Sequence, residues 1–133
     1  MFGEKLITFW KSTAWSLFVL FVFLLPSDNL SKAPSVPYLA EAVHFIMFSI
    51  LTWLLYHDML RNRAGIISFG KHSLIALCVG LTFGIVIEIL QELSGLGRKA
   101  EFKDVLFDLG GIIASIGILW LLFLLKQNTD IKD

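Results

Sequence analysis

The sequence has little charge and almost no cysteine. Asp, Glu, Lys and Arg make up 17% of its 133 residues, whereas a soluble domain of this length typically has about 25% charged residues. The formal net charge is zero, so no bulk electrostatic field recruits nucleic acid or an acidic partner. A single cysteine, Cys78, excludes an internal disulfide, and its apolar neighbours predict a buried thiol that only fills space.

Several sequence motifs of enzymes are also absent. The chain has no serine or cysteine nucleophile motif, no glycine-rich phosphate loop and no His-x-x-x-His pair. It contains no internal repeat and no low-complexity tract, and its length suffices for a single domain, residues 1–133. Apolar sequence is abundant instead, since 56% of the residues are hydrophobic.

The apolar residues gather in four segments, at about 6–26, 39–60, 73–93 and 105–125. About 20 apolar residues in a helix cross a hydrocarbon core about 30 Å thick, and open strands would leave backbone groups unpaired in lipid. The sequence therefore predicts an all-α integral membrane protein, a bundle of four transmembrane helices with short loops. A cleaved signal peptide is the alternative for the first segment, but no small-x-small cleavage site follows Pro26.

Basic residues are distributed unevenly between the two ends of these segments. Seven of the 11 Lys and Arg residues lie in the N-terminal segment, the loop between the second and third spans, and the C-terminal segment. Because cytoplasmic loops carry the excess of Lys and Arg, both termini are predicted to be cytoplasmic. The loop between the third and fourth spans is then expected to face outward.

Glu88 is an acidic residue inside the third span, within the stretch "GIVIEIL". An acid at the centre of a span costs roughly 2.5–3.5 kcal/mol on insertion scales, so its side chain should face the bundle interior or water. Gln91 and Glu92 follow three and four residues later and lie near the same helical face. Gly80 and Gly84 continue this face and are expected to let a neighbouring helix approach closely.

The fourth span has a matching polar end. Asp104 and Asp108 are four residues apart and point the same way, and a face of small residues that includes Gly111 follows them. The turn "SGLGRKAEFK" is expected to fold Arg98 back toward the acids, where its guanidinium suits a carboxylate or a phosphate. His44 is expected at the same depth in the second span. Both a functional and a structural role stay open for this histidine.

Structural alternatives for these residues stay open. Asp104 alone is better explained as a helix cap, and Glu88 would pair with Arg98 to tie its helix to the loop. A solvated rim is expected for Glu92, Lys99, Glu101 and Lys103, and an interfacial location for His57 and His72 beside Asp58 and Lys71. Against a purely structural site, a buried ion pair is weak support for stability, and polar groups kept within a span favour a function.

The residues Glu88-x-x-Gln91, Arg98, Asp104 and Gly111 resemble the pattern of the VanZ-like family. Its members are small bacterial membrane proteins, named for one linked to teicoplanin (glycopeptide) resistance. The family pattern runs as Gly-x-x-x-Glu-x-x-Gln, a short loop with Arg, an Asp, an Asn four residues later, and glycines.

The resemblance covers residues 41–117 and includes a histidine typical of an upstream span, here His44. Two positions depart from the pattern. Asp108 stands where Asn is usual, which adds a negative charge, and Ala40 and Glu41 stand where an Asp-Lys pair often precedes the histidine. The resemblance implies a multi-pass protein of the bacterial cell membrane with a role at the cell envelope, and it implies no settled biochemical activity.

Four functions fit these residues. The first is an outward-facing site for a polar headgroup, that of a lipid-linked wall precursor or a phospholipid. The second is a membrane enzyme in which Glu88 is the catalytic acid or base, because a buried carboxyl suits proton transfer near neutral pH. The third is a structural or partner-binding protein, and the fourth is proton-coupled transport by an oligomer.

The residues assigned to substrate binding are His44, Gln91, Arg98, Asp104 and Asp108. Arg98 is expected to hold a phosphate or carboxylate, and the others hydroxyl or amine groups. The enzyme hypothesis leaves room for a divalent metal held by Asp104, Asp108 and His44, but the sequence does not assign a metal ligand or identify a cofactor. The bilayer is the one partner it establishes, and the oligomeric state stays open.

Overall fold

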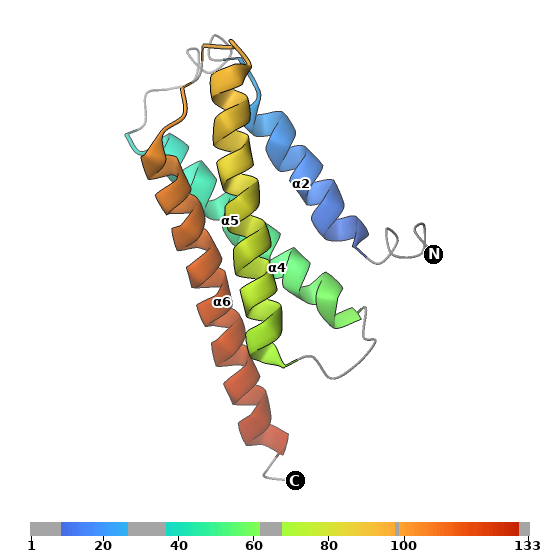
Figure 1. Cartoon of the computed structure of the whole chain (residues 1–133). Coiled ribbons are helices and arrows are strands. Elements are labelled where there is room, and N and C mark those ends of the chain that lie inside the picture. Colours follow the sequence, from blue (N-terminus) through green and yellow to red (C-terminus); the bar gives the residue numbers. More distant parts are fainter. Residues whose placement is uncertain (1–8, 27–36, 62–67, 98, 131–133) are drawn as a thin grey trace.

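The computed structural model describes residues 9–26, 37–61, 68–97 and 99–130. Within these ranges the chain forms four helices and no strand: α2 (Trp10–Phe23), α4 (Leu39–Arg61), α5 (Phe69–Leu93) and α6 (Phe102–Asp130) (Figure 1). The predicted all-α fold is therefore confirmed. Three of the helices are long and apolar enough to cross a membrane, over Leu39–Arg61, Phe69–Leu93 and Phe102–Asn128.

α2 is shorter than the predicted first span. It has 14 residues, which at 1.5 Å per residue corresponds to about 21 Å. The helix ends as the N–H of Leu24 bonds to the carbonyl of Leu20, and the chain turns before Pro26, because a residue that precedes proline is disfavoured in a helix. Residues 6–8 of the predicted span lie outside the described part of the chain.

Successive helices run in opposite directions. The start of α2 meets the end of α4, where the Ser12 hydroxyl bonds to Asp58, and the start of α5 meets the end of α6, where Phe69 stacks on Phe123. α2 therefore begins and α6 ends at one end of the bundle, while α4 and α6 begin and α5 ends at the other (Figure 1). This order agrees with both termini lying on one side, and that this side is cytoplasmic stays a prediction.

The core consists of apolar side chains from all four helices: Val19, Phe23, Phe48, Leu51, Ile87 and Ile112. Large apolar side chains also cover the outside of the bundle, for example Leu74 at 59% exposure and Ile113 at 57%. Helices that are apolar both inside and outside suit a lipid solvent. Cys78 is exposed, so the predicted buried thiol was wrong, because the buried line of α5 follows Ala76, Gly80 and Gly84 instead.

Two glycines mark close approaches between helices. α4 forms its most extensive interface with α6, and a Cβ at Gly111 would clash there with the backbone carbonyl oxygen of Phe45. Between α5 and α6, a Cβ at Gly84 would lie 2.6 Å from Oδ2 of Asp108. The predicted close packing of small-residue faces is confirmed at these positions, whereas nothing lies within 4 Å of a Cβ at Gly117.

Asp58 attaches α2 to the end of α4. Its side chain is fully buried, and its Oδ2 accepts the backbone N–H and the hydroxyl of Ser12, each at 2.9 Å. That N–H belongs to the first turn of α2, where backbone donors have no partner within the helix. His72 is also buried, whereas His57 is exposed, and the interfacial location expected for the two histidines stays a prediction.

Candidate functional site

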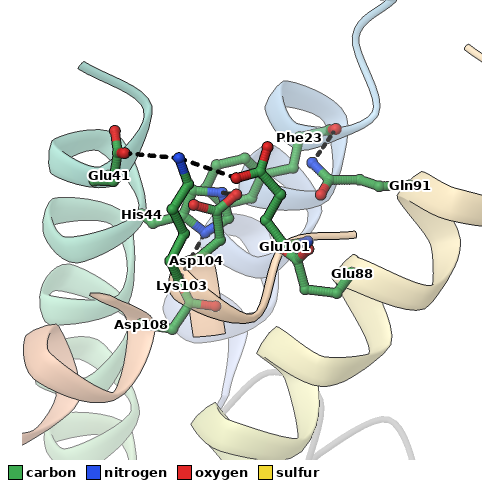
Figure 2. A network of polar contacts seen from close by, with 9 residues as sticks. All are labelled: Phe23, Glu41, His44, Glu88, Gln91, Glu101, Lys103, Asp104 and Asp108. Carbon is green, nitrogen blue, oxygen red and sulfur yellow. Dashed lines mark hydrogen bonds and ion pairs between the residues drawn. The ribbon is translucent and has the colours of Figure 1, made fainter. Parts of the chain in front are cut away.

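Five of the six predicted site residues lie in the described part of the chain and gather at one end of the bundle (Figure 2). His44 comes from the first turns of α4, Glu88 and Gln91 from the last turns of α5, and Asp104 and Asp108 from the first turns of α6. All five are buried. The sixth residue, Arg98, falls outside the described residues.

The ring of His44 is fixed by two contacts. Its Nδ1 lies 2.8 Å from Oδ1 of Asp108, and the ring stacks on Phe23 with the centroids 4.1 Å apart. When Asp108 is ionised, its carboxylate only accepts hydrogen bonds, so Nδ1 then carries the hydrogen and donates it to Asp108. Nε2 then faces Asp104, 3.6 Å from its Oδ2, and has no hydrogen-bond partner.

Glu88 connects α5 to the loop that leads into α6. Its Oε2 accepts the backbone N–H of Glu101 at 2.8 Å, while its Oε1 is buried and has no partner. The loop reverses direction through Gly95 (φ +66°) and Gly97 (φ +75°), a left-handed conformation that side chains disfavour. The glycines therefore let the loop fold back, and Glu88 fixes the start of α6 beside the end of α5.

Asp104 is directed at His44 rather than at the backbone of its own helix. α6 begins at Phe102, so Asp104 lies in the first turn and not before it. Its Oδ1 is buried without a hydrogen-bond partner, and its Oδ2 is the atom nearest to Nε2 of His44. The expected cap at Asp104 is therefore not formed, although a carboxylate in the first turn still complements the helix dipole.

Gln91 is buried but contacts α2. Its Nε2 donates to the carbonyl oxygen of Phe23 at 2.9 Å, one of the last carbonyls of α2, which have no partner within the helix. Figure 2 shows its side chain reaching toward Phe23 and away from Asp104. Gln91 thus positions Phe23, whose ring in turn packs on His44.

Lys103 forms an ion-pair bridge that the sequence pattern did not reveal. Its Nζ lies 3.1 Å from Glu41 and 2.9 Å from Glu101 (Figure 2). Lys103 and Glu101 were expected to form a solvated rim, and both side chains are about half exposed. Lys103 also joins α6 to Glu41, a buried acid of α4. The only sequence signals were that Glu41 precedes His44 by three residues and that Lys103 adjoins Asp104.

His44, Glu88 and Asp104 form the group within the described chain that could hold a metal ion. One ligand atom from each, an imidazole nitrogen or a carboxylate oxygen, lies within 4.8 Å of the other two, and all three residues are buried. Asp108 was grouped with Asp104 and His44 as a possible ligand, but it bonds the other nitrogen of His44. Glu88 takes its place beside the imidazole.

A separate cavity of about 480 Å³ lies at the opposite end of the bundle. It is lined mostly by aromatic and aliphatic side chains, among them Trp53, Tyr56, Phe69 and Phe123. None of the predicted site residues and no carboxyl group borders it. The polar cluster and this cavity are therefore distinct features.

A comparison with protein families gives a match over nearly the whole chain. The model of the VanZ/LLP1 family matches residues 3–124, which include every residue of the polar cluster. No curated protein and no solved structure matches the chain.

Proposed function

The chain belongs to the VanZ/LLP1 family, and from that membership we propose that it is a VanZ-like cell-envelope protein whose buried polar cluster binds the headgroup of a membrane lipid. The proposed ligand class is a lipid-linked wall precursor or a phospholipid. Both combine a phosphate, hydroxyl or amine groups and an apolar tail. The three long apolar helices provide the surface along which such a tail would lie.

The observation that carries this proposal is a set of buried polar atoms without partners. Nε2 of His44, Oε1 of Glu88 and Oδ1 of Asp104 are all unpaired, although buried polar groups are normally hydrogen-bonded and an unpaired one costs about 1–3 kcal/mol. They lie at one end of the three long apolar helices, which supports a site at the depth of the headgroups if these helices span the bilayer. Hydroxyl or amine groups of a headgroup would supply the missing hydrogen bonds.

The phosphate of the ligand is assigned to the basic residues of the loop and the first turn of α6. Lys103 is half exposed and adjoins the cluster, and Arg98 precedes it in the same connection. A guanidinium binds phosphate through two parallel hydrogen bonds, whereas a lysine acts as a point charge. Arg98 is thus the proposed anion-binding residue and Lys103 its partner at the rim.

The site is proposed to face the extracytoplasmic side. The support is the distribution of Lys and Arg, which places the α5–α6 loop opposite the more basic termini. A wall precursor becomes accessible to such a site only after it has crossed the membrane.

The experiment compares lipids that copurify with three forms of the protein in a mild detergent. These are the wild type, Glu88→Gln and, as the matched control, Glu92→Gln. The control removes an equal charge one turn further along α5, at an exposed carboxylate that accepts the N–H of Ala100. Mass spectrometry of the bound lipids and of the whole envelope lipid pool identifies each species.

A lipid retained by the wild type and by Glu92→Gln but lost from Glu88→Gln supports headgroup binding. Equal retention by all three forms contradicts it.

The enzyme hypothesis, with Glu88 as the acid or base, is favoured by one observation, the Asp108–His44 pair beside an unpaired carboxyl oxygen. It requires a species of changed mass in the pool of wild-type cells that is absent with Glu88→Gln.

A further inference from the structure

Three buried side chains converge on one point, and each has a buried polar atom without a hydrogen-bond partner: Nε2 of His44, Oε1 of Glu88 and Oδ1 of Asp104. His44 is 0% exposed, Glu88 5% and Asp104 7%. The facing atoms are one imidazole nitrogen and two carboxylate oxygens, within 4.8 Å of one another. Nε2 of His44 is 3.6 Å from the nearest oxygen of Asp104, too far for a hydrogen bond.

The tautomer of His44 leaves the facing nitrogen free to bind a cation. Nδ1 bonds to Asp108. With that carboxyl ionised, Nδ1 carries the hydrogen, so in the neutral ring the lone pair is on Nε2. This arrangement, a carboxylate that bonds one nitrogen while the other faces outward, is the one that orients histidine in metal sites. Phe23 stacks on the ring and prevents it from turning away.

The charges point to a cation as well. Three carboxyl groups, those of Glu88, Asp104 and Asp108, surround a single imidazole. Lys103, the basic residue next to Asp104 in the sequence, is bonded to Glu41 and Glu101. A buried charge is costly unless it is paired or bound to a metal. Two acids and one imidazole therefore present a net negative site to a divalent ion.

We propose that His44, Glu88 and Asp104 bind one divalent transition-metal ion, Zn²⁺ or Mn²⁺, and that Asp108 positions His44 for it. One nitrogen and two oxygens suit these ions, since imidazole favours zinc and carboxylates favour manganese among the common choices. Metal–ligand bonds of about 2.0–2.2 Å would draw the three atoms closer than they now lie. Rotation of the Glu88 and Asp104 carboxyl groups, each with a free oxygen, achieves that.

Three protein ligands leave at least one coordination position open. Zinc sites with three protein ligands characteristically keep the fourth position for water or substrate, and a phosphate oxygen is a suitable occupant. The ion would bind the same three side chains that the proposed headgroup binding uses, so a bound ion would itself contact the headgroup, but ion binding does not require the lipid. The ion binds to the protein alone, and lipid retention is a separate measurement.

The test uses the full chain, purified in detergent and treated with a chelator. Zn²⁺ and Mn²⁺ are titrated by calorimetry, and the bound metal is counted by elemental mass spectrometry after desalting. The wild type is expected to bind one ion per chain. Changes to residues around the metal ligands typically weaken binding by about 10–100-fold. His44→Ala, Glu88→Gln and Asp104→Asn, which remove a ligand, are each expected to weaken it more. Glu92→Gln is expected to leave metal binding unchanged.

Asp108→Asn distinguishes positioning from ligation, because the amide oxygen still accepts the Nδ1 hydrogen but carries no charge. It is expected to weaken binding by about 10–100-fold without abolishing it.

Should the ligand variants fail to fold, pulsed EPR of Mn²⁺ bound to the wild type decides, since coupling to an imidazole nitrogen requires a histidine ligand. Absence of stoichiometric binding, or of that nitrogen coupling, overturns the metal site. If the protein treated with chelator still retains its lipid, the proposed headgroup binding stands even where the metal site is overturned.

Discussion

Nδ1 of His44 and Oδ1 of Asp108 lie 2.8 Å apart in a fully buried hydrogen bond that joins α4 to α6. The two residues are 64 positions apart in the sequence, so the bond exists only in the folded bundle. It decides which nitrogen of His44 faces Glu88 and Asp104. His44, Asp108, Glu88 and Asp104 are therefore expected to act as one unit.

Replacing Asp108 by alanine should destabilise the bundle, because Nδ1 of His44 would be left buried without an acceptor. The expected loss is about 1–3 kcal/mol. Asp108→Asn keeps an acceptor and should retain most of the stability. Thermal unfolding in detergent, followed by circular dichroism, checks the difference. Equal melting temperatures for the two variants would mean that the hydrogen bond contributes little.

Gly84→Ala should disturb the site more than Gly80→Ala. A Cβ at Gly84 would lie 2.6 Å from Oδ2 of Asp108 and so displace the carboxylate that holds His44. A Cβ at Gly80 meets only the end of the Ile112 side chain, at 2.8 Å, which rotates away more easily. Overpacking of this kind costs about 1–3 kcal/mol. Metal affinity and melting temperature of both variants test the ranking, with Gly117→Ala as the unhindered control.

Asp58 and Ser12 should contribute to stability without affecting ligand binding, because they lie at the opposite end of the bundle from His44. Ser12→Ala removes the hydroxyl bond but keeps the backbone bond, with an expected loss of about 0.5–1.5 kcal/mol. Asp58→Ala removes both and leaves the Ser12 N–H unpaired, so its loss should be larger. A change in metal or lipid binding in the folded Ser12→Ala variant would contradict this separation of the two ends.

The orientation of the chain in the membrane can be tested with single cysteines in a Cys78→Ala background. Lys99→Cys lies in the α5–α6 loop and Gln127→Cys near the end of α6, and both positions are exposed. A membrane-impermeant maleimide added to intact cells should label position 99 and not position 127. Permeabilised cells, in which both react, provide the control. The reverse labelling pattern would place the site on the cytoplasmic side.

The helices and the composition of the polar cluster are predictable from the sequence, because apolar runs and helical spacing are local properties. The three-to-four residue spacing places Glu88 on the face of Gly84, and Asp104 on the face of Asp108. The expected depth of His44 in the second span adds this residue from a separate helix, and the family resemblance includes it as well. His44, Glu88, Asp104 and Asp108 lie together at the same end of the bundle (Figure 2).

The pairing of these residues is not predictable in the same way, because it depends on how the helices cross. Helical spacing does not reveal that Phe23 would stack on His44 or that Gln91 would turn to α2. It also left the bridge from Lys103 to Glu41 undetected. The expected buried Cys78 failed for the same reason, since an apolar stretch in a membrane helix has no sequence mark for its lipid-facing side.

Gly111 has a consequence for how the sequence can vary. The atom nearest to a Cβ at this position is the backbone oxygen of Phe45, and a backbone atom cannot move aside by changing a rotamer. In a library of all single substitutions, position 111 should accept glycine alone, whereas position 117 should accept many residues. Such a survey would therefore find the fewest tolerated substitutions in this region at Gly111, a residue without a functional group. The absence of a side chain there lets α4 and α6 approach closely and so keeps His44 within reach of Asp108.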